Sequence, residues 1–182
     1  MSEPTLIIIA GLRESGKTTL RKKMQDVDDY VFAPDEKYNQ LAQEKDLKKD
    51  DIVRKIMPNF YQDEKLKMVE VAKNNQNVII EVIGLSTKGR SIYKDKECFR
   101  HYRKEVWFIL PPQNEEEMKE LKERISKRKN KSPHTEAGLK EHLNIIAIPN
   151  LDEGFDVVKY FNIYGELTDY NSNVYQINDF EN

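Results

Sequence analysis

Eight residues near the start of the chain match the phosphate-binding pattern G-x-x-x-x-G-K-[ST]: Gly11-Leu12-Arg13-Glu14-Ser15-Gly16-Lys17-Thr18. In such a loop, successive backbone N–H groups converge on an anion, and the positive end of the following helix adds to the attraction. Lys17 would reach the β- and γ-phosphates of a nucleotide, and the Thr18 hydroxyl would ligate Mg²⁺. We therefore predict that ATP and Mg²⁺ bind to this loop and to Thr19, which follows it.

Two carboxylates stand where predicted strands end. Asp35 follows the short apolar segment 30–33, and Glu81 lies within the apolar segment 77–83. In open α/β sheets, ligands bind beyond the carboxyl ends of the strands, where a carboxylate can accept a proton from an attacking hydroxyl or hold Mg²⁺. Asp35 could equally cap a helix that starts at Glu36. Glu81 would be costly to bury alone, which favours a metal or a cation as its partner.

Basic residues crowd the segment 119–131, interspersed with Glu120 and Glu123. For most of them a solvated helix face with i,i+4 ion pairs explains the pattern. Arg124 and Arg128 differ, because a spacing of four places both guanidinium groups on one helical face, where they could clamp phosphates. We predict a basic helical lid over about residues 114–134.

Other candidate residues carry weaker signals. Tyr38, one helical turn beyond Asp35, could contact the acceptor substrate by stacking on a base, although a tyrosine on an amphipathic helix usually packs into the core. The three histidines and Cys98 lack the spacing of metal ligands. We predict no metal site from them.

Alternating strands and helices must position these residues. Apolar, β-branched runs predict buried strands at 6–10, 30–33, 77–83, 105–110 and 156–161. Between them, helices are expected at about 19–27, 37–47, 51–74 with an interruption near Pro58, 91–102, 114–129 and 135–146. This order predicts an α/β fold with a parallel sheet flanked by helices. A tail over about 165–182 follows, with a possible edge strand at 174–177.

Composition limits the class of protein. At 182 residues the chain fits one domain, 1–182, with a core that needs no disulfide. Its single cysteine predicts a reducing cytoplasm, and it lacks a secretion signal and membrane-length apolar runs. A net charge of −2 with 34% charged residues argues against non-specific nucleic-acid binding by the molecule as a whole. We predict no membrane partner; a monomer fits the size, and the sequence leaves the oligomeric state open.

The motif order resembles that of P-loop kinases of the polynucleotide 5′-kinase type, within the wider group of small nucleoside, nucleotide and zeta-toxin-like kinases. The resemblance covers roughly residues 5–147. It implies that Asp35 is the general base acting on an acceptor hydroxyl. It also implies that Arg124 and Arg128, together with the basic segment 129–131 that follows them, belong to the lid. It also implies a basic residue after the third strand that anchors phosphate, for which Arg90 and Lys88 are the nearest matches.

Two positions depart from that resemblance. Polynucleotide kinases tend to carry an arginine three residues after the base, where this chain has Tyr38. They tend to carry a small polar pair after the third-strand acid, where this chain has Val82-Ile83. Both departures weaken the case for a polynucleotide end as acceptor and leave phosphoryl transfer untouched.

The sequence therefore predicts a kinase that moves the γ-phosphoryl of ATP to a hydroxyl of a nucleotide or nucleic acid. A polynucleotide 5′-OH and a hydroxymethylated pyrimidine in DNA both fit. A nucleoside, nucleoside monophosphate or other small-metabolite kinase remains an alternative, as does a non-catalytic nucleotide-binding module or an NTPase. A GTPase is disfavoured because the nearest N-K-x-D candidate, 130–133, lacks the Asp. An ABC or AAA-type motor is disfavoured because no L-S-G-G-Q follows the loop.

Overall fold

A computed structural model describes residues 3–44, 52–127 and 135–170 of the chain. Within these ranges, strands and helices alternate: β1 (Thr5–Gly11), α1 (Lys17–Met24), β2 (Tyr30–Phe32), α2 (Pro34–Glu44), α4 (Met57–Lys73), β3 (Val78–Glu81), α5 (Thr87–Lys94), β4 (Arg103–Ile109), α6 (Glu115–Lys127), α7 (Thr135–Asn144), β5 (Val157–Phe161) and β6 (Leu167–Thr168). A π-helical turn, Ile52–Ile56, precedes α4, and 3₁₀ turns lie at Glu97–Phe99 and Leu151–Glu153.

The described strands form one sheet in the order β2-β3-β1-β4-β5-β6. The pairs from β2 to β5 are parallel, and only the short β6 runs antiparallel to β5. The predicted parallel α/β sheet flanked by helices is confirmed. Since β1 lies between β3 and β4, its connection runs toward one edge of the sheet and that of β3 toward the other, which creates the crevice where open sheets bind ligands.

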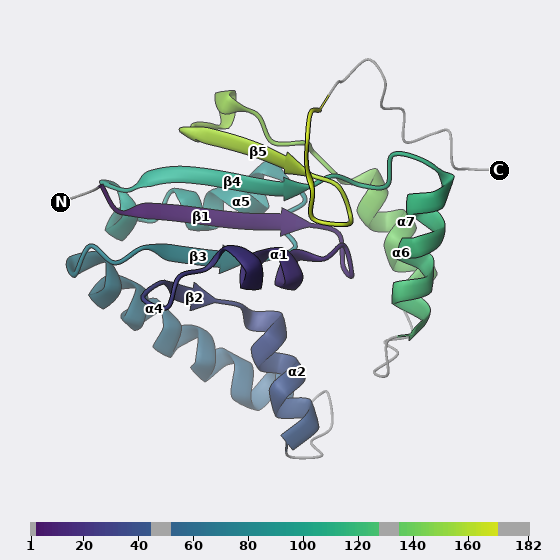
Figure 1. Ribbon diagram of the computed structural model, residues 1–182. Helices are drawn as coiled ribbons and strands as arrows, with labels where there is room; N and C mark the ends of the chain where they lie inside the picture. The colour runs from purple at the N-terminus through teal and green to yellow at the C-terminus, as the bar shows by residue number, and fades with distance from the viewer. Residues whose placement is uncertain (1–2, 45–51, 128–134, 171–182) are drawn as a thin grey trace.

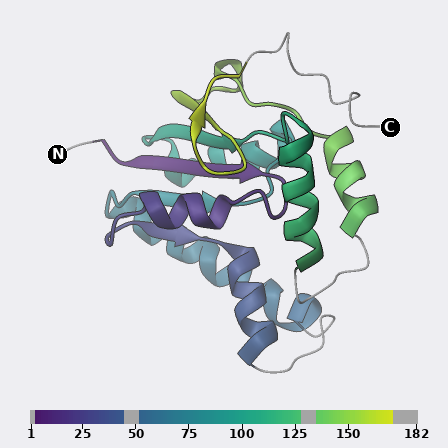
Figure 2. The same cartoon turned by 45° about the vertical axis from the view of Figure 1, so that its right-hand side comes forward.

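Period-two alternation along β1 divides the core between the two faces of the sheet. Leu6, Ile8 and Ala10 pack with residues of α4, α6 and α7, whereas Ile9 packs with Leu20 of α1 on the opposite face. Figure 1 shows α1 in front of the sheet and α5 behind it. Figure 2 shows α6 and α7 side by side beyond the carboxyl ends of the strands.

Most predicted elements are present, with shifted ends. The predicted strand at 156–161 is β5, and the break near Pro58 is the junction of the π-turn with α4. The prediction of a helix at 91–102 was wrong in its bounds, since α5 spans Thr87–Lys94. Helix α5 begins at Thr87 because the Ser86 side chain caps it by accepting a hydrogen bond from Gly89 N–H at 3.1 Å.

The C-terminal part of the chain departs from the prediction in one element. Strand β6 was not predicted, because two residues carry no detectable alternation. The predicted strand at 174–177 lies outside the described residues. No helix in the described ranges has the length and apolar character that a bilayer crossing requires.

Candidate functional site

The phosphate-binding loop has the geometry that its sequence predicts. It connects β1 to α1, and three of its positions adopt positive φ: Gly11 at 153°, Glu14 at 57° and Gly16 at 102°. A side chain at Gly16 would also bring its Cβ within 3.2 Å of the Ile163 carbonyl oxygen. Glycine is therefore required there by both conformation and space, and the non-glycine Glu14 in the left-handed region marks a loop held for function.

The loop also contains polar groups that the protein alone does not satisfy. Among the described residues, the Ser15 hydroxyl is the one buried side-chain polar atom without a hydrogen-bond partner. The first N–H groups of α1 have no partner within the helix because of helical geometry. Such donors at a helix start are the groups that an anion satisfies.

Lys17 lies against its own loop. Its Nζ donates to the carbonyl oxygens of Leu12 at 2.7 Å and Gly11 at 3.1 Å. Burial of the ammonium lowers the pKa of Lys17 to about 8, although the nearby carboxylates of Glu81 and Asp35 act in the opposite direction. The cation is thus desolvated before any ligand arrives, which strengthens its attraction to an incoming phosphate.

Glu81 ends β3 on the sheet face that carries α1, and it is buried. The Thr18 hydroxyl donates to its Oε1 at 2.5 Å, and Arg21 Nε donates to its Oε2 at 2.7 Å. The cation that the sequence led us to expect beside this carboxylate is Arg21. Thr18 and Glu81 also meet, as the predicted metal site requires.

Arg21 was missed at the sequence level although it is almost fully buried. Besides Glu81, its guanidinium contacts Glu36 of α2 at 2.5 Å and the Gln25 side chain at 2.7 Å. Glu36 is the neighbour of Asp35, so Arg21 connects the candidate metal ligands to the element that carries the candidate base. Helical spacing could have identified Arg21 from the sequence, because it lies one turn beyond Thr18 on the same face of α1 and contacts the same strand.

Asp35 occupies the second position of α2, where it is exposed and lines the main cavity. The helix starts at Pro34, and the N–H groups of Glu36 and Lys37 donate to the Ala33 carbonyl. Asp35 is therefore not the helix cap, which was the alternative interpretation. Its carboxylate faces the same space as Lys17 and Thr18.

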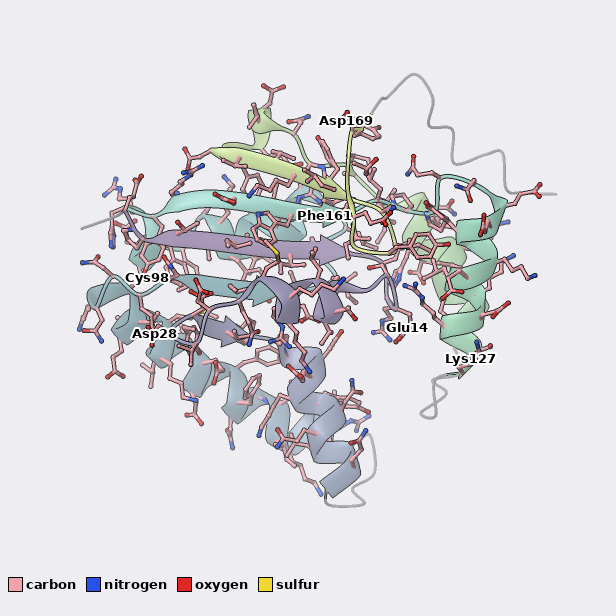
Figure 3. The ribbon with its side chains drawn as sticks, in the orientation of Figure 1. Glu14, Asp28, Cys98, Lys127, Phe161 and Asp169 are labelled. Atoms are coloured by element: carbon pink, nitrogen blue, oxygen red, sulfur yellow. The ribbon has the colours of Figure 1, made fainter. Side chains whose placement is uncertain are left out.

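One cavity of about 770 Å³ brings these residues together. It is lined by the loop and α1, by Asp35, Glu36 and Asn39 of α2, by Glu81, by Arg124 and Lys127 of α6, and by the turn 163–165 between β5 and β6. Figure 3 shows Glu14 and Lys127 at the same edge of the sheet. The volume lies within the range of small-molecule sites.

Arg124, one of the two arginines assigned to a lid from the sequence, contacts the turn after β5. Arg124 donates to the Ile163 carbonyl at 2.8 Å and to Glu120 at 2.7 Å, and its guanidinium lies 5.8 Å from the Tyr164 ring centre. Sequence reasoning missed this turn, because no local pattern marks Ile163 to Gly165 as cavity residues. Arg128 lies outside the described residues.

Three predicted substrate contacts lie outside the main cavity. Arg90 is fully buried and pairs with Glu153, and it donates to the Gly84 carbonyl at 2.8 Å. Because α5 begins at Thr87, Arg90 points into the core and supports the loop after β3. Lys88 is exposed elsewhere on α5, and Tyr38 packs against the cluster of Leu41, Ile52 and Met57, the packing alternative considered for it.

The residues fit a magnesium ion bound through few protein ligands. Mg²⁺ usually keeps several waters and takes one or two carboxylates plus substrate phosphates. Thr18 and Glu81 provide one hydroxyl and one carboxylate. Among the described residues no group of three or more His, Cys, Asp or Glu side chains is placed to hold a metal by itself. This donor set suits an ion that arrives with a nucleotide.

Solved structures of kinases share this architecture. A proposed kinase from Chloroflexus aurantiacus matches with a TM-score of 0.62 and 18% identity, over 96% of this chain and 93% of that chain. The fold is that of a P-loop kinase. A fungal RNA kinase matches this kinase fold with a TM-score of 0.54 and 17% identity, over 94% of this chain and 79% of that chain.

A chain of the PezAT toxin–antitoxin system of Streptococcus pneumoniae is also similar in structure, with a TM-score of 0.56 and 15% identity, over 92% of this chain and 72% of that chain. No protein-family model matches the chain, and no curated protein is similar to it in sequence. Identities this low establish the kinase fold alone, so the activity must be derived from the site.

Proposed function

We propose that this protein is an ATP-dependent kinase that phosphorylates a hydroxyl group of a nucleotide or nucleic acid. The observation that carries the proposal is the shared cavity: the phosphate-binding loop, the Thr18–Glu81 pair and the exposed Asp35 carboxylate all line it. A phosphate cradle alone would suit any nucleotide-binding protein. A free carboxylate on the far side of the phosphates adds the group that an acceptor hydroxyl needs.

The triphosphate of ATP would lie along the loop, with the N–H groups at the start of α1 donating to its oxygens. Lys17 would exchange the carbonyls of Gly11 and Leu12 for the β- and γ-phosphates. Thr18 and Glu81 would hold Mg²⁺, which neutralises charge on the phosphate oxygens when bound. Arg21 keeps the Glu81 carboxylate in place through its 2.7 Å hydrogen bond.

In the transfer step, the acceptor oxygen bonds to the γ-phosphorus while the bond from that phosphorus to the β–γ bridging oxygen breaks. ADP leaves with that electron pair, and the hydroxyl proton passes to the Asp35 carboxylate. Arg124, with Arg128, would neutralise the charge that develops on the transferring group.

Cations around the cavity support an acceptor that itself carries phosphate. Arg13, Lys23 and Lys127 line the same space as Asp35. A 5′-hydroxyl end of a nucleic acid brings such phosphates with it, whereas a free nucleoside does not.

A label-transfer screen tests the proposal. The protein and ATP labelled on its γ-phosphate are incubated with one class of acceptor in each reaction. The classes are 5′-hydroxyl oligonucleotides, nucleosides, nucleoside monophosphates and small hydroxylated metabolites. We expect label on an oligonucleotide or nucleotide hydroxyl, and none with Lys17→Ala. Label found only on inorganic phosphate would indicate an NTPase, and ATP binding without turnover would indicate a non-catalytic module.

A further inference from the structure

A second cavity lies beside the end of β2, where Phe32 lines it. It has a volume of about 260 Å³ and lies between α4 and the end of α5. Its walls combine aromatic, apolar, basic and polar side chains with one carboxylate: Phe32, Tyr61, Gln62, Glu64, Lys65, Met68, Ile92, Tyr93 and Lys96. We call this cavity the aromatic groove.

Helical spacing builds one wall of the groove. Tyr61, Lys65 and Met68 recur along one face of α4, and Tyr93 and Lys96 come from α5 and the residues just after it. Phe32 lies between them, with ring-centre distances of 6.2 Å to Tyr61 and 5.8 Å to Tyr93. Tyr61 remains 47% exposed, so its ring is available for a further contact.

The groove lies next to the candidate general base. Phe32 ends β2, and Asp35 follows three residues later. The pKa values of Tyr61 and Tyr93 are raised first by burial and then by neighbouring groups, among which the Asp35 carboxylate acts on both. Both phenols therefore lie within electrostatic reach of the base. In Figure 1, α2 and the first turns of α4 lie together below the sheet, as the shared cluster of Leu41 and Met57 requires.

The chemistry of the lining favours a nucleobase with a phosphate backbone beside it. Aromatic rings stack on the faces of bases without regard to sequence, and lysines at the rim attract phosphates. Among the described residues, neither Lys65 nor Lys96 forms an ion pair. The one carboxylate that lines the groove, Glu64, is already engaged by Tyr30 and by Lys67 at 2.8 Å. The volume lies below that of sites for drug-sized molecules, and suits one flat ring system.

We propose that the aromatic groove seats a base near the 5′ end of a single-stranded nucleic acid and thereby presents the terminal hydroxyl to Asp35. This inference rests on the proposed kinase function and names its acceptor. Tyr61 supplies the stacking surface, while Lys65 and Lys96 contact the backbone phosphates. Every base has a flat face on which an aromatic ring can stack, so the groove would accept different sequences.

Affinity for an oligonucleotide tests the groove apart from catalysis. A 5′-hydroxyl oligonucleotide with a 3′-fluorophore is titrated with protein, and its anisotropy is followed for Tyr61→Ala, Tyr61→Phe and the control Leu66→Ala, an exposed residue of α4 outside the groove. We expect Tyr61→Ala to weaken binding by about 5-fold to 100-fold. Tyr61→Phe, which keeps the ring, and Leu66→Ala should bind like the native protein.

The lysines provide a second variant that does not depend on removing a ring. Lys65→Gln should lower affinity and reduce the slope of log affinity against log salt by about 0.7, the value for one phosphate contact on a single strand. Unchanged binding by both Tyr61→Ala and Lys65→Gln would overturn the groove proposal. A free nucleoside that competes as strongly as the oligonucleotide would also overturn it, because the acceptor would then be a small molecule.

Label transfer separates failure of the groove from failure of the kinase function. If the native protein phosphorylates the oligonucleotide, Tyr61→Ala should raise the acceptor KM and leave the KM for ATP unchanged. Transfer with an unaltered acceptor KM in Tyr61→Ala would refute the groove while the kinase function stands. Tyr61-dependent binding without any transfer would refute the kinase function while the nucleic-acid groove stands.

Discussion

Arg21 Nε donates to Glu81 Oε2 at 2.7 Å, and both side chains are almost completely removed from water. This pair joins α1, the helix that follows the phosphate-binding loop, to the end of β3. The same carboxylate accepts the Thr18 hydroxyl at 2.5 Å, so its position is fixed from two sides. A carboxylate held in this way can receive a metal ion without first being ordered.

Arg21→Gln should destabilise the fold, because it leaves the Glu81 charge buried and without its cation. Removing one partner of a buried pair costs about 3–5 kcal/mol. Urea unfolding followed by circular dichroism measures the loss. Lys22→Ala is the matched control: it removes an exposed pair to Glu36 at 3.0 Å, worth about 0–1 kcal/mol. Equal stability of the two variants would contradict the structural role given to Arg21.

ATP affinity should fall as pH rises through about 8, the pKa to which burial lowers Lys17. Below that pH the ammonium is charged and attracts phosphate; above it the neutral amine does not. Bound phosphate restores the charge, so ATP binding should also take up a proton between about pH 8 and pH 10.5, the ordinary value. Calorimetry in buffers of different ionisation enthalpy measures both effects. Lys17→Ala should bind ATP weakly and without this pH dependence.

The sign of the Lys17 effect on stability follows from the same shift. Since the pKa is lower in the folded protein, the folded state disfavours the protonated amine. The penalty is fully present below about pH 8 and disappears as pH rises toward 10.5. Unfolding free energies between pH 8 and 10 should therefore carry a rising contribution in the native protein that Lys17→Ala lacks.

The lid arginines should be intolerant of lysine. Arg124 uses two separate donors, one to Ile163 and one to Glu120, and an ammonium cannot reproduce that planar arrangement. We expect Arg124→Lys and Arg128→Lys to lower kcat almost as much as the alanine variants. Lys122→Ala, on the exposed side of α6, should be nearly silent. Mild effects at all three positions that fade with added salt would indicate a solvated helix face instead.

Local sequence patterns predicted the elements that depend on local physics. The loop from Gly11 to Thr18 follows from a motif whose glycines have steric reasons, and the strands follow from uninterrupted β-branched runs such as Ile7-Ile8-Ile9. The parallel order follows because helices separate the strands. Glu81 was identified because a carboxylate in an apolar run needs a partner.

The rest of the site depends on contacts between distant segments. The turn at Ile163–Gly165 lies beside Arg124 and Gly16 because β5, which precedes the turn, pairs with β4 in the sheet. Arg90 was predicted to contact phosphate. Because α5 begins at Thr87, one turn earlier than predicted, the Arg90 side chain pairs with Glu153 instead. No spacing rule in a single sequence relates Tyr61 on α4 to Tyr93 on α5, because their proximity arises from packing around Phe32.

Phosphoryl transfer by Asp35→Asn tests the central claim most directly. Asp35 is exposed and lies outside the buried ion pairs, so asparagine should fold normally and retain ATP affinity. Transfer of label from γ-labelled ATP to an acceptor hydroxyl should fall by about 10²-fold or more, the usual scale for loss of a general base. Undiminished transfer by Asp35→Asn would contradict the account of this protein as a kinase that uses Asp35 as its base.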